Sequence, residues 1–133
     1  RGLPSWLLGQ AARRAHDLVS AALAPEGLRR QHFTLLAALA ERGPASQADL
    51  GRQLWVDRSD LHAIVSTLED QGLVVRRADP NDQRRKVVAI TGAGTRKLKR
   101  LETRIVSAQE EVLAPLEAAE RGQLLALLRR LST

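Results

Sequence analysis

With 133 residues, the chain has the length of one folded domain and is too short to form two independent ones. Hydrophobic residues make up 44% of it and charged residues 27%, which excludes a disordered tail and a membrane protein, and the absence of cysteine excludes disulfides, thiolate zinc sites and cysteine nucleophiles. The net charge of +6 accompanies abundant leucine and alanine and only three aromatic residues, a composition that favours helices around an aliphatic core.

The first 45 residues predict two helices. After Pro4, apolar residues recur at helical spacing until Pro25, and a second helix over 28–42 ends at Gly43 and Pro44, a pair that breaks helices. The apolar positions of the first helix are Leu8, Ala11, Ala12, Ala15, Leu18, Val19 and Ala22, and those of the second are Phe33, Leu36 and Leu39.

Two short helices joined by a tight turn follow. Ser46 and Asp57 each stand three residues before an aspartate, the spacing of an N-cap, and therefore open helices over 48–54 and 57–71. One face of the second helix is apolar and must point inward, with Leu61, Ile64, Val65 and Leu68. The outward face is small and polar, which suits a DNA major groove, and consists of Ser59, Ala63, Ser66 and Thr67, flanked by Asp60 and His62.

After Gly72 the pattern changes from helical to strand-like. Strands over 73–78 and 86–90, separated by a turn at 79–82, predict a hairpin with a basic tip. Thr91 then caps a long helix that continues to Leu113 and is broken at Pro115. A last, leucine-rich helix begins at about Glu117.

The positive charge is concentrated in one region. Residues 76–104 hold ten basic and three acidic side chains, a local net charge of +7, so that the rest of the chain carries −1. Clustered positive charge is typical of a surface that binds phosphates. For the part after Arg96, a solvated basic helix face explains the pattern equally well.

Helix, turn, helix and hairpin in this order give the plan of a winged helix-turn-helix, a mainly α fold with a small β-hairpin wing. The sequence also resembles the MarR family of transcriptional regulators. The motifs that carry the resemblance are Asp57-Arg58-Ser59, Leu68-Glu69, Gly72-Leu73-Val74, Asp79-Pro80-Asn81-Asp82, Arg84, Val88-Ala89-Ile90-Thr91 and Gly94.

The resemblance implies a single domain over 1–133, with a DNA-binding lobe at 28–91 and N- and C-terminal dimerisation helices at 1–27 and 92–133. It also implies a homodimer whose two lobes straddle a palindromic operator in double-stranded DNA. The protein would be a repressor, and a small ligand would release it from the DNA. The last helix and Trp6, which lies opposite the Ala15 face, present more apolar surface than one small core needs, in agreement with a homodimer. Alternatively, the apolar stripes of the first and last helices pack on each other within one chain.

For the recognition helix, we expect base contacts from side chains at its start, namely Arg58, Ser59, Asp60, His62, Ala63 and Ser66. The sequence departs from the family here, which commonly has threonine at positions 60 and 62 and arginine at 63. Asp60 can accept a hydrogen bond from cytosine N4 or pair with Arg58. His62 donates to guanine or phosphate, or is an exposed polar residue without a role.

For the wing, the family's Asp-x-Arg element is matched by Asp82 and Arg84, and we expect Arg84 to brace the hairpin while Arg85, beside Lys86, reaches the minor groove. Ser46 and Gln47, at the start of the preceding helix, are predicted phosphate contacts because a helix N-terminus favours anions.

Other functions find little support. Ser59, Asp60 and His62 are crowded on one helix with no group to orient a base, and the three histidines are too far apart for a metal site, so we expect neither an enzyme nor a cofactor. A winged-helix module for protein–protein interaction, without sequence-specific DNA binding, is the main alternative. No signal-peptide pattern or membrane span is evident, which predicts a cytoplasmic protein.

The resemblance implies an effector cleft between the dimerisation helices and the lobe. Arg14 and His16 flank the buried face of the first helix and His32 begins the second, so we expect them to bind an aromatic carboxylate or phenol. Surface solvation of Arg14 and packing of the histidines at the edge of the core are the alternatives.

Overall fold

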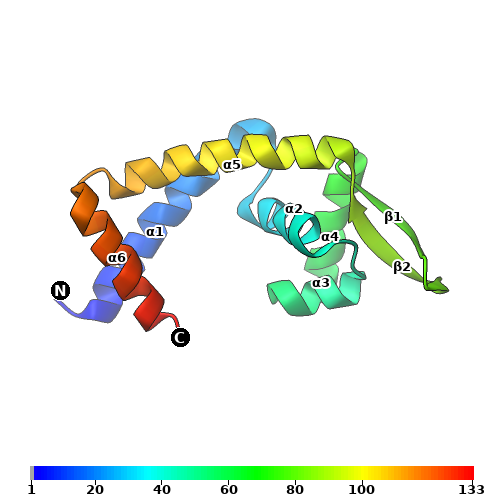
Figure 1. Ribbon diagram of the computed structural model, residues 1–133, viewed down its shortest axis with the longest axis horizontal. Helices are drawn as coiled ribbons and strands as arrows, with labels where there is room; N and C mark the ends of the chain where they lie inside the picture. The colour runs from blue at the N-terminus through cyan, green and yellow to red at the C-terminus, as the bar shows by residue number, and fades with distance from the viewer. Residues whose placement is uncertain (1) are drawn as a thin grey trace.

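The computed structural model describes residues 2–133 and shows an elongated molecule (Figure 1). The elements are α1 (Pro4–Leu23), the short 3₁₀ helix η1 (Ala24–Glu26), α2 (Arg30–Arg42), α3 (Gln47–Leu54), α4 (Arg58–Asp70), β1 (Val74–Asp79), β2 (Asp82–Ile90), α5 (Gly92–Leu113) and α6 (Ala118–Leu131). This is the mainly helical fold with one antiparallel hairpin that the sequence predicts.

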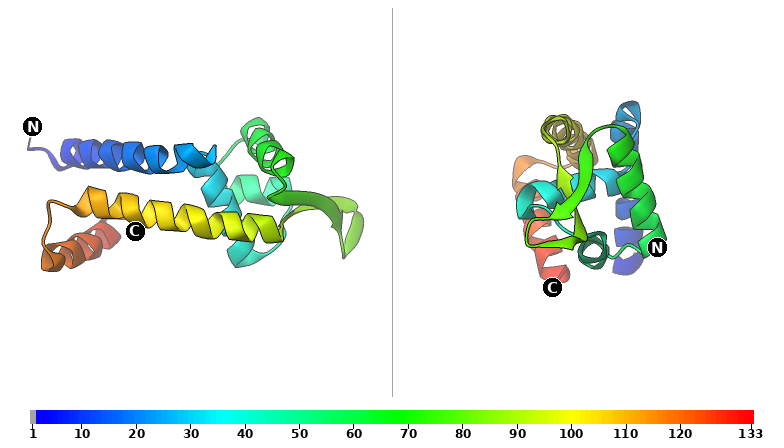
Figure 2. Two further views of the ribbon diagram at one scale, coloured as in Figure 1. Left: turned by 90° about the horizontal axis from the view of Figure 1, so that it is seen from above. Right: turned by 90° about the vertical axis from the view of Figure 1, so that its right-hand side faces the viewer.

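The long helix α5 connects two parts of the molecule. Its first half lies over the lobe formed by α2, α3, α4 and the hairpin, and its second half runs beside α1 (Figures 1 and 2). At its far end the chain turns back into α6, so that both termini lie at the end remote from the hairpin. None of the helices in 2–133 is long and apolar enough to cross a membrane.

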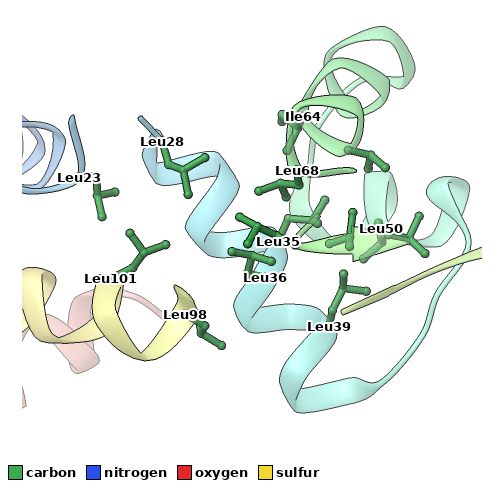
Figure 3. Close-up of a cluster of buried hydrophobic side chains, with 14 of the residues drawn as sticks. Leu23, Leu28, Leu35, Leu36, Leu39, Leu50, Ile64, Leu68, Leu98 and Leu101 are labelled. Atoms are coloured by element: carbon green, nitrogen blue, oxygen red, sulfur yellow. The ribbon is translucent and has the colours of Figure 1, made fainter. Parts of the chain in front are cut away.

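A single aliphatic core joins the lobe to the helix pair (Figure 3). Leu23 of α1 and Leu101 of α5 face the same cluster as Leu35 and Leu36 of α2 and Leu68 of α4, and all five are fully buried. The first half of α1 and all of α6 contribute no buried residue to it. The apolar stripes of these two helices therefore remain on the surface of the single chain.

The hairpin is longer than the sequence pattern suggested. We predicted that its second strand begins at Lys86, but β2 begins at Asp82 and pairs with β1 as far as the Asp79–Asp82 pair. Pro80 and Asn81 alone form the tip, where Asp79 Oδ1 accepts a hydrogen bond from the Asn81 amide at 2.9 Å. Asp82 pairs with Asp79 across the two-residue turn, whereas residues 83–85 form an irregularity between that pair and the Ala78–Lys86 pair.

Trp55, at the turn between α3 and α4, combines two unusual properties. Its φ of 57° lies in the left-handed region, which side chains with a Cβ adopt at a cost, and its side chain is 93% exposed. It closes α3 by donating its backbone N–H to the Gly51 carbonyl. The conformation is imposed by the turn and not by packing of the indole.

We therefore expect Trp55→Gly to raise the free energy of unfolding by about 0.5–1 kcal/mol, because glycine adopts a positive φ without strain. Trp55→Ala is the matched control, since it removes the indole but keeps the Cβ. Urea denaturation followed by circular dichroism measures both. Equal midpoints for the glycine and alanine variants would show that the backbone carries no strain here.

Candidate nucleic-acid interface

Side-chain caps begin both α3 and α4. The Ser46 hydroxyl accepts a hydrogen bond from the Asp49 amide at 3.1 Å, and Asp57 Oδ1 accepts one from the Asp60 amide at 2.9 Å. The Asp60 amide also holds the pKa of Asp57 below its usual value. The charged carboxylate lies at the positive end of the α4 dipole, so the start of α4 is held in place.

The faces of α4 agree with the predicted pattern. Leu61, Ile64, Val65 and Leu68 are buried, while the opposite side is exposed or half-buried. Ser59 and Ala63 are exposed, and Ser66 is half-buried. The exposed side of α4 therefore offers small and polar groups to a partner.

The remaining residues predicted to contact DNA divide between the two flanks of α4. Asp60 and Ala63 line a cavity of about 610 Å³ beside the start of α2, whereas Arg58 and His62 line a shallower hollow with Gln47 of α3. The Asp57 carboxylate raises the pKa of Asp60. Within 2–133 no ion pair joins Asp60 to Arg58, so the predicted pairing of these two residues is not formed in the free chain.

Arg85 makes the bracing contacts that we predicted for Arg84, and a DNA contact by either arginine stays a prediction. Arg85 donates to the Ser46 hydroxyl at 3.0 Å and pairs with Asp49, which fastens β2 to α3. Arg84 has a side chain that is 95% exposed, with Asp82 Oδ1 3.7 Å from its Nε. Arg85 therefore braces the hairpin, whereas the side chains of Arg84 and Lys86 are exposed to solvent.

The side chains at the start of α3, predicted to contact phosphate, already have hydrogen-bond partners within the chain. The Ser46 side chain is buried, and its oxygen already receives hydrogen bonds from Asp49 and Arg85. A side-chain hydrogen bond with Ser46, together with the charges of Arg85 and Arg52, lowers the pKa of Asp49. Gln47 Oε1 accepts from Arg76 Nε at 2.8 Å. For a phosphate, this helix end retains the backbone amides of Gln47 and Ala48, since that of Asp49 donates to Ser46.

Arg76 is a structural residue that sequence reasoning counted only as charge. It lies on β1, and its side chain contacts both α3 and α4, including Glu69 Oε1 at 2.6 Å from Nη1. The sequence signal for this structural role was the alternation of the two faces along a strand, which puts Arg76 on the same face as buried Val74. An arginine on the inward face of a strand requires a partner, which the sequence does not name.

Three cations of the basic stretch on α5 share one carboxylate. Lys97, Arg100 and Arg104 surround Glu26 of η1, at 2.8, 3.5 and 3.2 Å respectively. A hydrogen bond from Lys97 and the charges of all three cations lower the pKa of Glu26. These residues join η1 to α5, and because Glu26 balances only one of the three cations, net positive charge remains on this helix.

The three residues predicted to bind an effector do not come together. Arg14 donates to the backbone carbonyls of Glu111 and Val112, at 3.1 and 3.0 Å, and so satisfies the last turn of α5. His16 is exposed on α1. His32 alone lines the 610 Å³ cavity, where its neighbours include Arg29 and Gln31 and, across the gap, Thr67 of α4. Within 2–133 no three histidine or acidic residues cluster as a metal site would require.

His32 makes the start of α2 sensitive to pH. Its Nδ1 accepts a hydrogen bond from the Arg29 amide at 2.9 Å, which requires a neutral ring, and burial followed by the charge of Arg29 lowers the pKa of His32. The unfolded chain therefore binds the proton more readily. This contribution to stability is complete above a pH of about 6.5 and is lost as the pH falls through the lower pKa of the folded state.

We expect the urea midpoint of the wild-type protein to fall between pH 7.5 and pH 5.5 and that of His32→Gln to fall less. Glutamine accepts the same hydrogen bond from the N-cap amide but does not titrate. Denaturation of both proteins at the two pH values measures the difference. Parallel decreases would assign the pH dependence to another group.

Comparison with known proteins agrees with this architecture. The MarR family model matches residues 26–85. The putative transcriptional regulatory protein for the hcr operon of Thauera aromatica is 36% identical over 106 residues, which are 80% of this chain and 64% of that protein, so the chain spans slightly less than two thirds of that relative. The transcriptional repressor Rv2887 of Mycobacterium tuberculosis is 32% identical over 128 residues, 96% of this chain and 92% of the relative.

Solved structures show the same fold. The structure of Rv2887 in complex with DNA has a TM-score of 0.87 at 28% identity and covers the whole of both chains. The structure of CouR from Rhodococcus jostii RHA1, bound to p-coumaroyl-CoA, has a TM-score of 0.77 at 27% identity, and the match covers 96% of this chain and 90% of CouR. The two curated relatives are named as transcriptional regulators, and the chain belongs to the MarR family, with the winged helix-turn-helix fold.

Proposed function

We propose that the protein is a homodimeric repressor that binds a palindromic operator and is released by a small aromatic or phenolic acid. The observation that carries the DNA-binding geometry is the exposed polar side of α4, which packs beside α3, with Arg84 exposed at the wing. In this proposal α4 enters the major groove and the wing follows the minor groove.

The base contacts come from α4, and the wing and α3 position it. Ser59, His62 and Ser66 offer hydrogen bonds to base edges, and Asp60 accepts from cytosine N4. Arg84 and Lys86 contact the minor groove or its phosphates, while the first backbone amides of α3 bind a phosphate. Arg58 supplies a further positive charge at the start of α4.

The apolar surfaces at the ends of the chain support the dimer. Trp6 of α1 is 51% exposed and Leu127 of α6 is 53% exposed, and further large apolar side chains on the same two helices are exposed as well, namely Leu7, Leu8, Leu125 and Leu131. Monomeric proteins seldom leave so many large apolar groups exposed to water. A second copy that covers these helices would bury them and place two lobes on one side of the dimer.

The cavity between α2 and α4 is the proposed effector site. It has room for a small ligand, and it combines the apolar side chains of Leu28 and Ile64 with the charge of Arg29. CouR, which has the same fold, is bound to an aromatic acyl thioester. Because Ala63 and Asp60 of α4 line this cavity, a ligand there competes for the side chains that read DNA or shifts the helix that carries them.

Selection of bound duplexes from a random pool, followed by fluorescence anisotropy across a range of salt concentrations, tests the DNA-binding proposal. We expect a palindrome with half-sites about one helical turn apart and affinity that falls steeply with added salt. If no duplex binds at low salt, the winged-helix protein-interaction module is the better interpretation. Addition of p-coumarate, or of its coenzyme A thioester, to the protein–duplex complex tests whether the ligand releases the protein from DNA.

A further inference from the structure

The side chain of Arg76 connects the wing to both helices of the helix-turn-helix. Its Nη1 donates to Glu69 Oε1 at 2.6 Å, its backbone amide donates to Glu69 Oε2 at 3.3 Å, and its Nε donates to Gln47 Oε1 at 2.8 Å. Its Nη2 lies 3.4 Å from both the Ser66 hydroxyl and His62 Nδ1. One guanidinium therefore contacts α3 and three residues of α4.

The geometry of these contacts requires arginine. The donors of a guanidinium are fixed in one plane, so that one edge can bind Glu69 while Nε binds Gln47. The ammonium of a lysine is a single point that cannot reach both partners at once. The Arg76 side chain is only 21% exposed, and its charge is balanced by Glu69. Both facts make it a poor ligand for a phosphate.

The positions of its partners connect Arg76 to DNA reading. His62 and Ser66 are α4 residues that the proposed function assigns to base contacts, and Gln47 belongs to the α3 end assigned to a phosphate. Loss of Arg76 would free all of these side chains, and would leave α4 held against the wing mainly by apolar packing. The orientation of α4 in the groove would then be less well defined.

We infer that Arg76 is a positioning residue for sequence-specific DNA recognition: it aligns α4 with α3 and the wing through Glu69 and Gln47, without contacting DNA itself. This inference rests on the proposed DNA-binding function. It predicts that Arg76 affects discrimination between sequences, whereas an arginine that contacts phosphate affects all sequences alike.

The neighbouring residue Arg77 provides a matched control. It lies on the same strand but is exposed, and Arg77→Gln removes the same formal charge as Arg76→Gln. The double variant Glu69→Gln/Arg76→Gln removes the ion pair to α4 with no change in net charge. Arg76→Lys keeps the positive charge but lacks the planar guanidinium. Circular dichroism and thermal unfolding establish that each variant is folded.

The experiment measures the affinity of each protein for a duplex selected from a random pool and for a scrambled duplex, at several salt concentrations. For Arg76→Gln and the double variant we expect affinity for the selected duplex to fall about 10- to 100-fold, while affinity for the scrambled duplex changes less than about threefold. The slope of log affinity against log salt concentration should stay the same. Arg76→Lys should give an intermediate loss. Arg77→Gln should weaken both duplexes by a similar factor.

Three results would overturn the inference. A salt slope reduced by about 0.9 in Arg76→Gln, with equal loss on both duplexes, would show a direct phosphate contact. Unchanged discrimination in the folded variants would show that α4 needs no such alignment, and Arg76→Lys decides the matter if Arg76→Gln does not fold. If the wild-type protein itself binds no duplex, the proposed function fails, and the inference fails with it.

Discussion

Gly94→Ala is expected to lower the free energy of unfolding by about 3 kcal/mol or more, the upper part of the range for overpacked cores. Gly94 is buried in the first turn of α5, and a Cβ there would clash with the Leu73 backbone carbonyl and lie 2.7 Å from Ile90 Cγ1. The Leu73 carbonyl cannot move away easily, because it accepts the Thr91 amide at 3.0 Å. Thermal unfolding followed by circular dichroism measures the loss.

The same substitution elsewhere in the chain provides the control. Gly122 lies inside α6 with no atom within 4 Å of where its Cβ would be, so Gly122→Ala should raise stability by about 0.5–1 kcal/mol through helix propensity. A Gly94→Ala protein as stable as the wild type would mean that α5 can separate from the Leu73 turn. The contact between α5 and the lobe would then be looser than the structure shows.

Local signals were sufficient to predict most of the elements. The caps Ser46, Asp57 and Thr91 each precede the helix that the sequence assigned to them, because a cap acts on amides two or three residues away. The apolar face of α4 was likewise correct, since helical periodicity alone determines which side turns inward. The wing tip was less predictable, because exposed strand residues such as Arg84 and Arg85 carry no alternation of burial.

The partners of charged side chains could not be predicted from the sequence. Arg84 and Arg85 are adjacent in the chain, and which of them meets Asp49 depends on how the hairpin lies against α3. In the same way, Glu26 and Lys97 form an ion pair across 71 positions of the sequence, a contact determined only by the packing of η1 on α5. A count of charges locates a basic region, but tertiary contacts decide which charges remain available to DNA.

Leu127→Glu is expected to weaken dimerisation by about a thousandfold and DNA affinity by about a hundredfold or more. In a twofold-symmetric interface the substitution occurs twice, and each copy loses the burial of a leucine and places a carboxylate against an apolar surface, together at least about 4 kcal/mol. A lobe that is no longer tethered to its partner also loses the effective concentration, of millimolar order, that favours binding at the second half-site. Sedimentation at several protein concentrations and fluorescence anisotropy measure the two effects.

The exposure of Leu127 in the single chain makes this test selective for association. Since its side chain is 53% exposed, glutamate there should leave the fold of the monomer intact, which circular dichroism can verify. Ala126, exposed on the opposite side of α6, provides the control, because Ala126→Glu adds the same charge away from the leucine stripe and should leave the dimer unchanged. If Leu127→Glu still sedimented as the wild-type dimer, the interface would lie elsewhere on the molecule. If it became a monomer without losing DNA affinity, a single lobe would be sufficient for binding, and the palindromic operator would not be required.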